Sequence, residues 1–359
     1  MLRGWPVISL LVLLITAAGS GLSVFARGQE EQPTTRSADG IAEGFENAFV
    51  RLPVPSKILR SYARQIEKHM GASGALGSNN SVRSGAHDNW FVEPQRRGYE
   101  LVAAGVAADD ERFVELGLRA LEWAFARQDP DGSFASAFHS TSIFLAAAAR
   151  SVLLLQQAKV SDGIRRRAQA LIPRMHKAAS WLAEPARLQS GVNRVFTHRF
   201  FLVATALQEV AVLTGDEHLA AAATPLVLEG LSRQRSDGVF PERDGPDTTY
   251  HSLSIELITR YAVLIKDSEL RRTLRGSAKR AVDWLVERVG PDGTILHDQN
   301  TRTGRCDQRN RGGKPKNVGY KRMPLQLSYY GSFWGDMDTV HRVVDSVAAR
   351  GPRFALDCP

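Results

Sequence analysis

Apolar side chains recur at intervals of three and four residues along most of the chain after residue 40. The stretches RFVELGLRALEWAFARQ, TSIFLAAAARSVLLLQQ, RFFLVATALQEVAVLTG and SLSIELITRYAVLIKD all show this period. Such spacing places the apolar positions on one face of an α-helix. No convincing run of alternating apolar and polar residues predicts a β-strand. The pattern therefore predicts an all-α fold.

A turn motif, Asp-Gly followed by an apolar residue, ends several of these helical stretches. It occurs in WAFARQDPDGSF, SRQRSDGVF and WLVERVGPDGTI, where the Asp-Gly pairs begin at positions 131, 237 and 292. The first interval is about twice the second, so a further copy is expected between the first two pairs, near Trp181. The segments AFHSTSIFLAAAARSVLL and TYHSLSIELITRYAVL also share a pattern. This periodicity indicates a repeated helical hairpin of about 55 residues.

Six such hairpins could form either an open solenoid or a closed toroid. Two long, polar inserts rich in glycine, 71–89 and 296–320, favour the toroid, with loops gathered around one mouth. Long stretches without secondary structure in a compact domain are usually functional. We predict one domain over residues 41–359, an α/α toroid of about six helical hairpins whose Asp-Gly turns lie on one face.

The start of the chain, 1–26, has the pattern of a secretory signal peptide. Arg3 precedes the short apolar run VISLLVLLITAAG, and small residues lie near Ala26, where a signal peptidase would cut. We predict a signal peptide over 1–26, a polar linker over 27–40, and a secreted or periplasmic protein without a stable membrane anchor after cleavage. An uncleaved membrane anchor is the alternative.

The chain is basic and contains only two cysteines. Its formal net charge is +8, and loss of Arg3 with the signal peptide leaves +7. A basic exported protein suggests an anionic partner, such as an acidic polysaccharide, a phosphate-bearing polymer or a membrane surface. Cys306 and Cys358 could form a disulfide in an oxidising compartment. We expect a monomer without metal or cofactor and without a nucleic-acid partner, because neither a His/Cys cluster nor a nucleic-acid-binding module is present.

Two stretches, NRVFTHRFFLVATALQEVAVLTGD and DGVFPERDGPDTTYHSLSIELI, resemble the alginate lyase family that has an α/α toroid fold. The first resembles the Asn-Asn-His-x-Tyr helix of that family. The second resembles its later segment, in which an Arg precedes a Tyr-His pair; here Arg243 and His198 both precede Tyr250 at spacings similar to those of the family. The resemblance is good over these two stretches and extends to the rest of the chain only as a repeat architecture. Thr197 stands where the family has its catalytic Asn.

The resemblance implies cleavage of a uronate polymer by β-elimination. That reaction needs a neutralised carboxylate, a base for the C5 proton and an acid for the C4 oxygen. A tyrosine between cationic groups suits the proton transfers, because nearby positive charge lowers its pKa. The catalytic candidates are Tyr250, His198, Arg243 and His251. Each also has a structural interpretation: a packing and capping role for Tyr250, packing for His251, a surface position for His198 and a solvated ion pair for Arg243.

Further residues are candidates for substrate binding. They are Asn193, Arg199, Trp90, Arg96, His139 and Arg311. The basic run 301–322, TRTGRCDQRNRGGKPKNVGYKR, could form a flexible lid over an anionic chain or a solvated loop.

Two other functions remain open at this point. Asp237, Glu242 and Asp247 lie close in sequence, and many glycoside hydrolases on this toroid use a pair of carboxylates as acid and base. The other function is that of an exported glycan-binding toroid without catalytic activity. Thr197, which stands in place of the catalytic Asn, favours it. A Glu242→Gln change is expected to be tolerated by a lyase and to damage a hydrolase.

Overall fold

The structure is a computed structural model, and it describes residues 53–81, 90–184, 187, 193–310 and 313–350. All of them belong to one compact unit, 36–359. The predicted signal peptide, the predicted linker, Arg311 and Cys358 lie outside the described residues.

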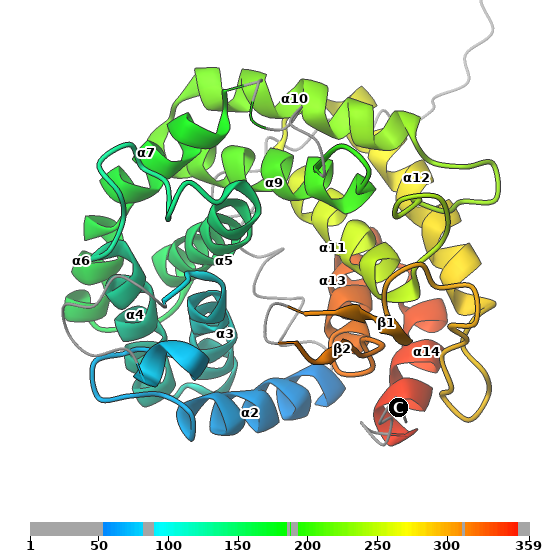
Figure 1. The fold of residues 1–359 in the computed structure, drawn as a ribbon, viewed down its shortest axis with the longest axis horizontal. Coiled ribbons are helices and arrows are strands. Elements are labelled where there is room, and N and C mark those ends of the chain that lie inside the picture. Colours follow the sequence, from blue (N-terminus) through cyan, green and yellow to red (C-terminus); the bar gives the residue numbers. More distant parts are fainter. Residues whose placement is uncertain (1–52, 82–89, 185–186, 188–192, 311–312, 351–359) are drawn as a thin grey trace, which may run out of the picture. The chain divides into compact units, whose positions relative to one another are not determined.

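Five helices form the inner layer of a ring, and α2 (Pro53–Glu67) closes it (Figure 1). The inner helices are α3 (Gly98–Ala108), α5 (Phe138–Gln157), α9 (Thr197–Thr214), α11 (Thr248–Leu264) and α13 (Met323–Trp334). Each packs against the next in this order, and α2 contacts both α13 and α3, so the ring closes.

The outer layer consists of α4 (Glu111–Phe125), α6 (Asp162–Ala170), α7 (Ile172–Leu182), α10 (Glu217–Ser232), α12 (Ser268–Val286) and α14 (Met337–Arg350). Each outer helix packs on the inner helix that precedes it in the chain, and α6 and α7 both cover α5. Among the described residues, five inner helices therefore carry an outer partner, and α2, which is buried on one face and leads into the turn before α3 as the outer helices do before theirs, completes the ring. The prediction of an all-α toroid is confirmed.

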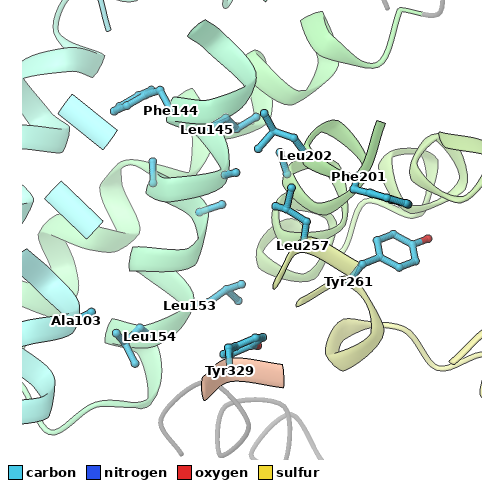
Figure 2. Packing of buried hydrophobic residues seen from close by; sticks show 14 of the residues in the cluster. Ala103, Phe144, Leu145, Leu153, Leu154, Phe201, Leu202, Leu257, Tyr261 and Tyr329 are labelled. Atoms are coloured by element: carbon cyan, nitrogen blue, oxygen red, sulfur yellow. The ribbon is translucent and has the colours of Figure 1, made fainter. Parts of the chain in front are cut away.

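The division into two layers follows from the distribution of apolar residues. The outer helix α12 buries Leu274, Ala278, Ala281 and Leu285, which share one face. Inner helices are buried nearly all round, and their side chains belong to one buried cluster (Figure 2). Of the described helices, only α5 is long and apolar enough to span a membrane, and 83% of its apolar window is buried inside the protein. Its composition is that of a core helix of the ring.

The Asp-Gly turns require glycine because each lies directly against the next outer helix. Gly238 has φ +93°, and a Cβ there would lie 2.3 Å from the carbonyl oxygen of Arg280 in α12. Gly132 and Gly293 also have positive φ and lie equally close to α7 and α14. Each turn connects an outer helix to the next inner helix, so all three lie at the end of the ring where inner helices begin, as predicted.

The repeat has one more copy than the Asp-Gly signal revealed. Gly74 has φ +96°, and a Cβ there would lie 2.4 Å from the carbonyl oxygen of Arg119 in α4. Its turn lacks the aspartate, which is why the sequence pattern missed it. The copy expected after Trp181 falls in 185–192, which lies outside the described residues except for Arg187.

Short elements lie at the end of the ring where the inner helices begin. They are the 3-10 helices η1 (Gly77–Ser81) and η2 (Glu93–Arg97) and the strands β1 (Arg305–Arg309) and β2 (Pro315–Lys316), which pair antiparallel. The insert predicted as a long loop thus contains a β-hairpin. Cys306 in β1 is disulfide-bonded. The N-termini of helices carry partial positive charge, so the mouth that the inner helices surround at this end favours anions.

Candidate active site

A cleft of about 480 Å³ lies where the inner helices α5, α9, α11 and α13 begin. His139 is the second residue of α5, His198 is the second residue of α9, and Tyr250 is the third residue of α11. All three line the cleft together with residues of η2 and of the β1–β2 hairpin. Side chains that are far apart in sequence therefore meet because the repeat returns each inner helix to the same end of the ring.

His198 and Glu242 form a buried pair at the wall of the cleft. Nδ1 of His198 lies 2.8 Å from Oε1 of Glu242, and the backbone N–H of His198 donates to the same oxygen at 3.1 Å. Nη1 of Arg302 donates to the other carboxylate oxygen at 3.0 Å. Glu242 is 0% exposed and His198 1% exposed. Such a pair resembles the carboxylate–histidine unit that orients a catalytic base.

The pKa shifts of this pair fix where its proton lies. Burial raises the pKa of Glu242, but His198 and Arg302 outweigh it and lower the pKa below its usual range. Burial lowers the pKa of His198 by more than Glu242 raises it. At neutral pH the carboxylate is therefore ionised and the imidazole neutral, so Nδ1–H donates to Glu242. Nε2 is left as a proton acceptor, and no described residue forms a hydrogen bond with it.

Tyr250 lies directly beside this pair. Its ring centroid is 4.6 Å from that of His198, and the guanidinium of Arg302 lies 3.8 Å from the centre of the Tyr250 ring. Burial raises the pKa of Tyr250 by more than Arg302 lowers it. The predicted lowering of its pKa is therefore wrong in direction. A phenol that keeps its proton serves as an acid rather than as a phenolate base.

The cleft is strongly cationic. Its described lining includes Arg96, Arg199, Arg302, Arg309, Lys316 and Arg322, against the single carboxylate of Glu93. Glu93 accepts a hydrogen bond from the Ser140 hydroxyl at 2.8 Å. Arg96 is half-buried, and its guanidinium forms no hydrogen bond or ion pair with the described residues. Burial and the charge of Arg322 lower its pKa to about 10. An anion bound here would neutralise charges that the protein leaves uncompensated.

Arg243, the arginine expected beside Tyr250, is exposed and is not among the residues that line the cleft. Its φ is +63°, and its N–H donates to the carbonyl of Val195 at 2.7 Å. Arg302 occupies the place between the Phe196 and Tyr250 rings instead. It belongs to the later run 301–322 that was predicted as a lid, and the charge of that run was the only sequence signal for it.

Thr197 does not replace the expected asparagine in the cleft. Its hydroxyl donates to the carbonyl oxygen of Pro241 at 2.6 Å, and its side chain is buried. It ties the start of α9 to the segment that carries Glu242.

Two predicted site residues pack in the core or against it. His251 is fully buried; its Nδ1 accepts from the Phe240 N–H at 3.3 Å, and its Nε2 donates to the Ala281 carbonyl at 2.8 Å. Burial lowers the pKa of His251 to about 4. Trp90 packs edge-on against Trp123, with ring centroids 5.7 Å apart. Neither lines the cleft, and the packing interpretation of His251 describes its surroundings.

The other substrate-binding candidates differ in placement. Arg199 lines the cleft, and its Nη1 donates to the side-chain oxygen of Asn193, which does not itself line the cleft. Burial, followed by the charge of Arg302, lowers the pKa of Arg199 to about 10. His139 lines the cleft with its ring 6.1 Å from that of His198. Arg311 lies outside the described residues.

The carboxylates of the hydrolase alternative do not line the cleft. Asp247 is buried and caps α11 by accepting from the Tyr250 N–H at 3.2 Å. Asp237 lies in its turn and pairs with Arg235. Because Glu242 binds His198, a Glu242→Gln change is expected to damage a lyase as well as a hydrolase. The change therefore does not distinguish these two functions. Among the described residues, no three His, Cys, Asp or Glu side chains gather as a metal site requires.

No model of a protein family matches the chain, and no curated protein sequence matches it. Among solved structures, the Lin0763 protein of Listeria innocua is similar with a TM-score of 0.51 and 14% identity, over 86% of this chain and 89% of that one. The GH76A α-1,6-mannanase of Salegentibacter sp. HEL1_6 has a TM-score of 0.38 and 10% identity, over 87% of this chain and 100% of that one. The resemblance to the alginate lyase family stays a prediction. The chain therefore shares its fold with the Listeria innocua protein, and its activity has to be inferred from the cleft.

Proposed function

We propose that this protein is an exported polysaccharide lyase that cleaves a uronate-containing glycan by β-elimination. One observation carries the proposal. A histidine held by a buried carboxylate lies beside a tyrosine in the wall of a cationic cleft.

Each part of the reaction has a group suited to it. The cationic side chains Arg96 and Arg199 bind the uronate carboxylate and stabilise the charge that develops when C5 loses its proton. Nε2 of His198 accepts that proton, and Glu242 stabilises the resulting imidazolium. The C5–H electrons form the C4–C5 double bond, and the C4–O bond breaks. The Tyr250 hydroxyl donates its proton to the departing oxygen.

A lyase accounts for the cleft better than a carboxylate-pair hydrolase. Glycoside hydrolases of that kind place two carboxyl groups on either side of the scissile bond. In the described part of the cleft only Glu93 is a carboxylate, whereas six side chains are cationic. Such a lining favours a substrate that is itself negatively charged.

A panel of acidic and neutral polysaccharides tests the proposal. A lyase produces an unsaturated uronate, so short-ultraviolet absorbance should rise on an acidic polymer and stay flat on a neutral one. New reducing ends without absorbance would overturn the lyase in favour of a hydrolase. Binding without either signal would leave a glycan-binding protein.

A further inference from the structure

A second cavity, of about 140 Å³, adjoins the cleft inside the ring. We call it the axial cavity. It shares Arg96, Ile143, Leu253, Arg322 and Gln326 with the lining of the cleft. Because the same side chains border both spaces, the axial cavity lies directly beside the cleft.

The walls of the axial cavity are apolar and incompletely covered. Ile143 and Ala147 lie one turn apart on α5, Leu253 lies on α11, and Leu325 lies on α13. These four side chains are only half-buried, although they lie on inner helices whose other apolar residues form the core. Apolar surface that faces an open volume favours the entry of an apolar group.

Charge is distributed unevenly along the axial cavity. At its deep end Arg150 and Arg260, which line it, both pair with Glu256. Glu100 also lines the cavity and pairs with Arg322. At its junction with the cleft, Arg96 has no ion pair among the described residues. A fitting ligand therefore places a carboxylate near the junction and a small apolar group inside.

We propose that the axial cavity is a subsite for an O-acyl group carried by a uronate unit, so that the substrate class is an acylated acidic glycan. This inference rests on the proposed function for the uronate and on the cavity for the acyl group. An acetyl group adds a methyl that the apolar walls would cover. One such group in an apolar pocket typically changes affinity about 10-fold or more.

Binding and cleavage of two matched probes test this inference. One probe is a mannuronate hexamer without acyl groups, and the other is the same hexamer O-acetylated. Titration calorimetry should give a Kd about 10-fold lower for the acetylated probe. Absorbance reports cleavage separately. Equal Kd values would overturn the subsite even if both probes are cleaved. Preference for the acetylated probe without absorbance would keep the subsite and overturn the lyase, and binding of neither would overturn both.

Two variants examine the cavity itself, each through the ratio of the two Kd values. Ala147→Phe fills the axial cavity, so the ratio should fall to about one, whereas Ala221→Phe on the exposed face of α10 should keep it. Ile143→Ala enlarges the cavity and should raise the affinity for an O-butyrylated hexamer relative to the acetylated one. That gain cannot arise from misfolding. An unchanged ratio in folded Ala147→Phe, or no gain in Ile143→Ala, would contradict the proposal.

Discussion

Burial acts in opposite directions on the pKa values of Tyr250 and His198, which suits them to the proposed roles of acid and base. It raises the pKa of the phenol and lowers that of the imidazole, so both are neutral at neutral pH. In the proposed elimination, one group must give a proton and the other must take one. The ring centroids of His198 and Tyr250 lie 4.6 Å apart. Both side chains are neutral before the reaction, so the imidazole can take a proton and the phenol can give one.

Tyr250→Phe removes only the hydroxyl, with which no described residue forms a hydrogen bond. The cleavage rate should fall about 10²- to 10⁴-fold, the usual contribution of a general acid. The thermal unfolding midpoint should stay within a few degrees of the wild-type value. Initial rates from absorbance, measured beside a calorimetric unfolding scan, check both points. A variant with the wild-type rate would exclude Tyr250 as the acid.

Glu242→Gln should lower kcat on the order of 10²- to 10⁴-fold, because an amide can donate to Nδ1 and move the imidazole proton to Nε2. Glu242 raises the pKa of His198, so its loss lowers that pKa further. Activity that depends on neutral His198 is lost as the pH falls through this pKa. The acidic limb of the residual rate–pH profile should therefore move to lower pH. Asp237→Asn, in an exposed turn, is the control and should leave rate and profile unchanged.

Arg302 takes the place beside Tyr250 that sequence spacing assigns to Arg243. Arg302→Lys keeps a charge but loses the planar group that binds Glu242 and stacks on Tyr250. We expect its kcat/KM to fall about 10-fold or more, whereas the exposed Arg243→Ala should change kcat/KM less than about threefold. Steady-state kinetics on one acidic polymer compare the two. A larger loss of kcat/KM in Arg243→Ala than in Arg302→Lys would show that Arg243 acts beside Tyr250 as the sequence predicts.

At the scale of elements, the helical period and the Asp-Gly turns predicted the toroid, because both depend on local chain geometry. AFHSTS and TYHSLS share an aromatic-His-Ser pattern that pairs His139 with His251, but the two histidines occupy different places, because α5 begins at the aromatic residue whereas α11 begins two residues before it. One residue rotates a side chain by about 100° around a helix, so α5 presents His139 to the cleft and α11 presents Tyr250. The place of Arg302 depends on how a long insert folds, which no local pattern reveals.

The turn glycines offer a matched test of how the repeats pack. Gly238 and Gly215 both have positive φ, but a Cβ at Gly238 would lie 2.3 Å from a backbone oxygen of α12, and a Cβ at Gly215 would have no atom within 4 Å. Gly215→Ala should cost about 1 kcal/mol of unfolding free energy, from the backbone conformation alone. Gly238→Ala should cost roughly 3 kcal/mol or more, since α12 must also move. Denaturant unfolding measures both, and equal losses would show that the contact with α12 is unimportant.

At the scale of the whole molecule, the ring gathers positive charge at one end. Inner helices begin there, and their N-termini add partial positive charge to that of six cationic side chains around one cleft. The sequence composition predicted a basic protein. The toroid places part of the excess positive charge around one cleft, where it produces a local electrostatic field. Such a field attracts a polyanion before any specific contact forms.

Ionic strength should therefore separate binding from chemistry in the proposed reaction. Salt shortens the Debye length from about 10 Å at 0.1 M to about 3 Å at 1 M, which screens the cleft from an approaching polymer. Between these concentrations we expect KM for a polyuronate to rise about 10-fold or more. Buried groups are screened much less, so kcat, which depends on the His198–Glu242 pair and Tyr250, should change little. Arg96→Met should raise KM at low salt and flatten its dependence on salt, because it removes one of the charges being screened. A KM that does not respond to salt, with kcat falling instead, would mean that the field of the cleft does not select the substrate.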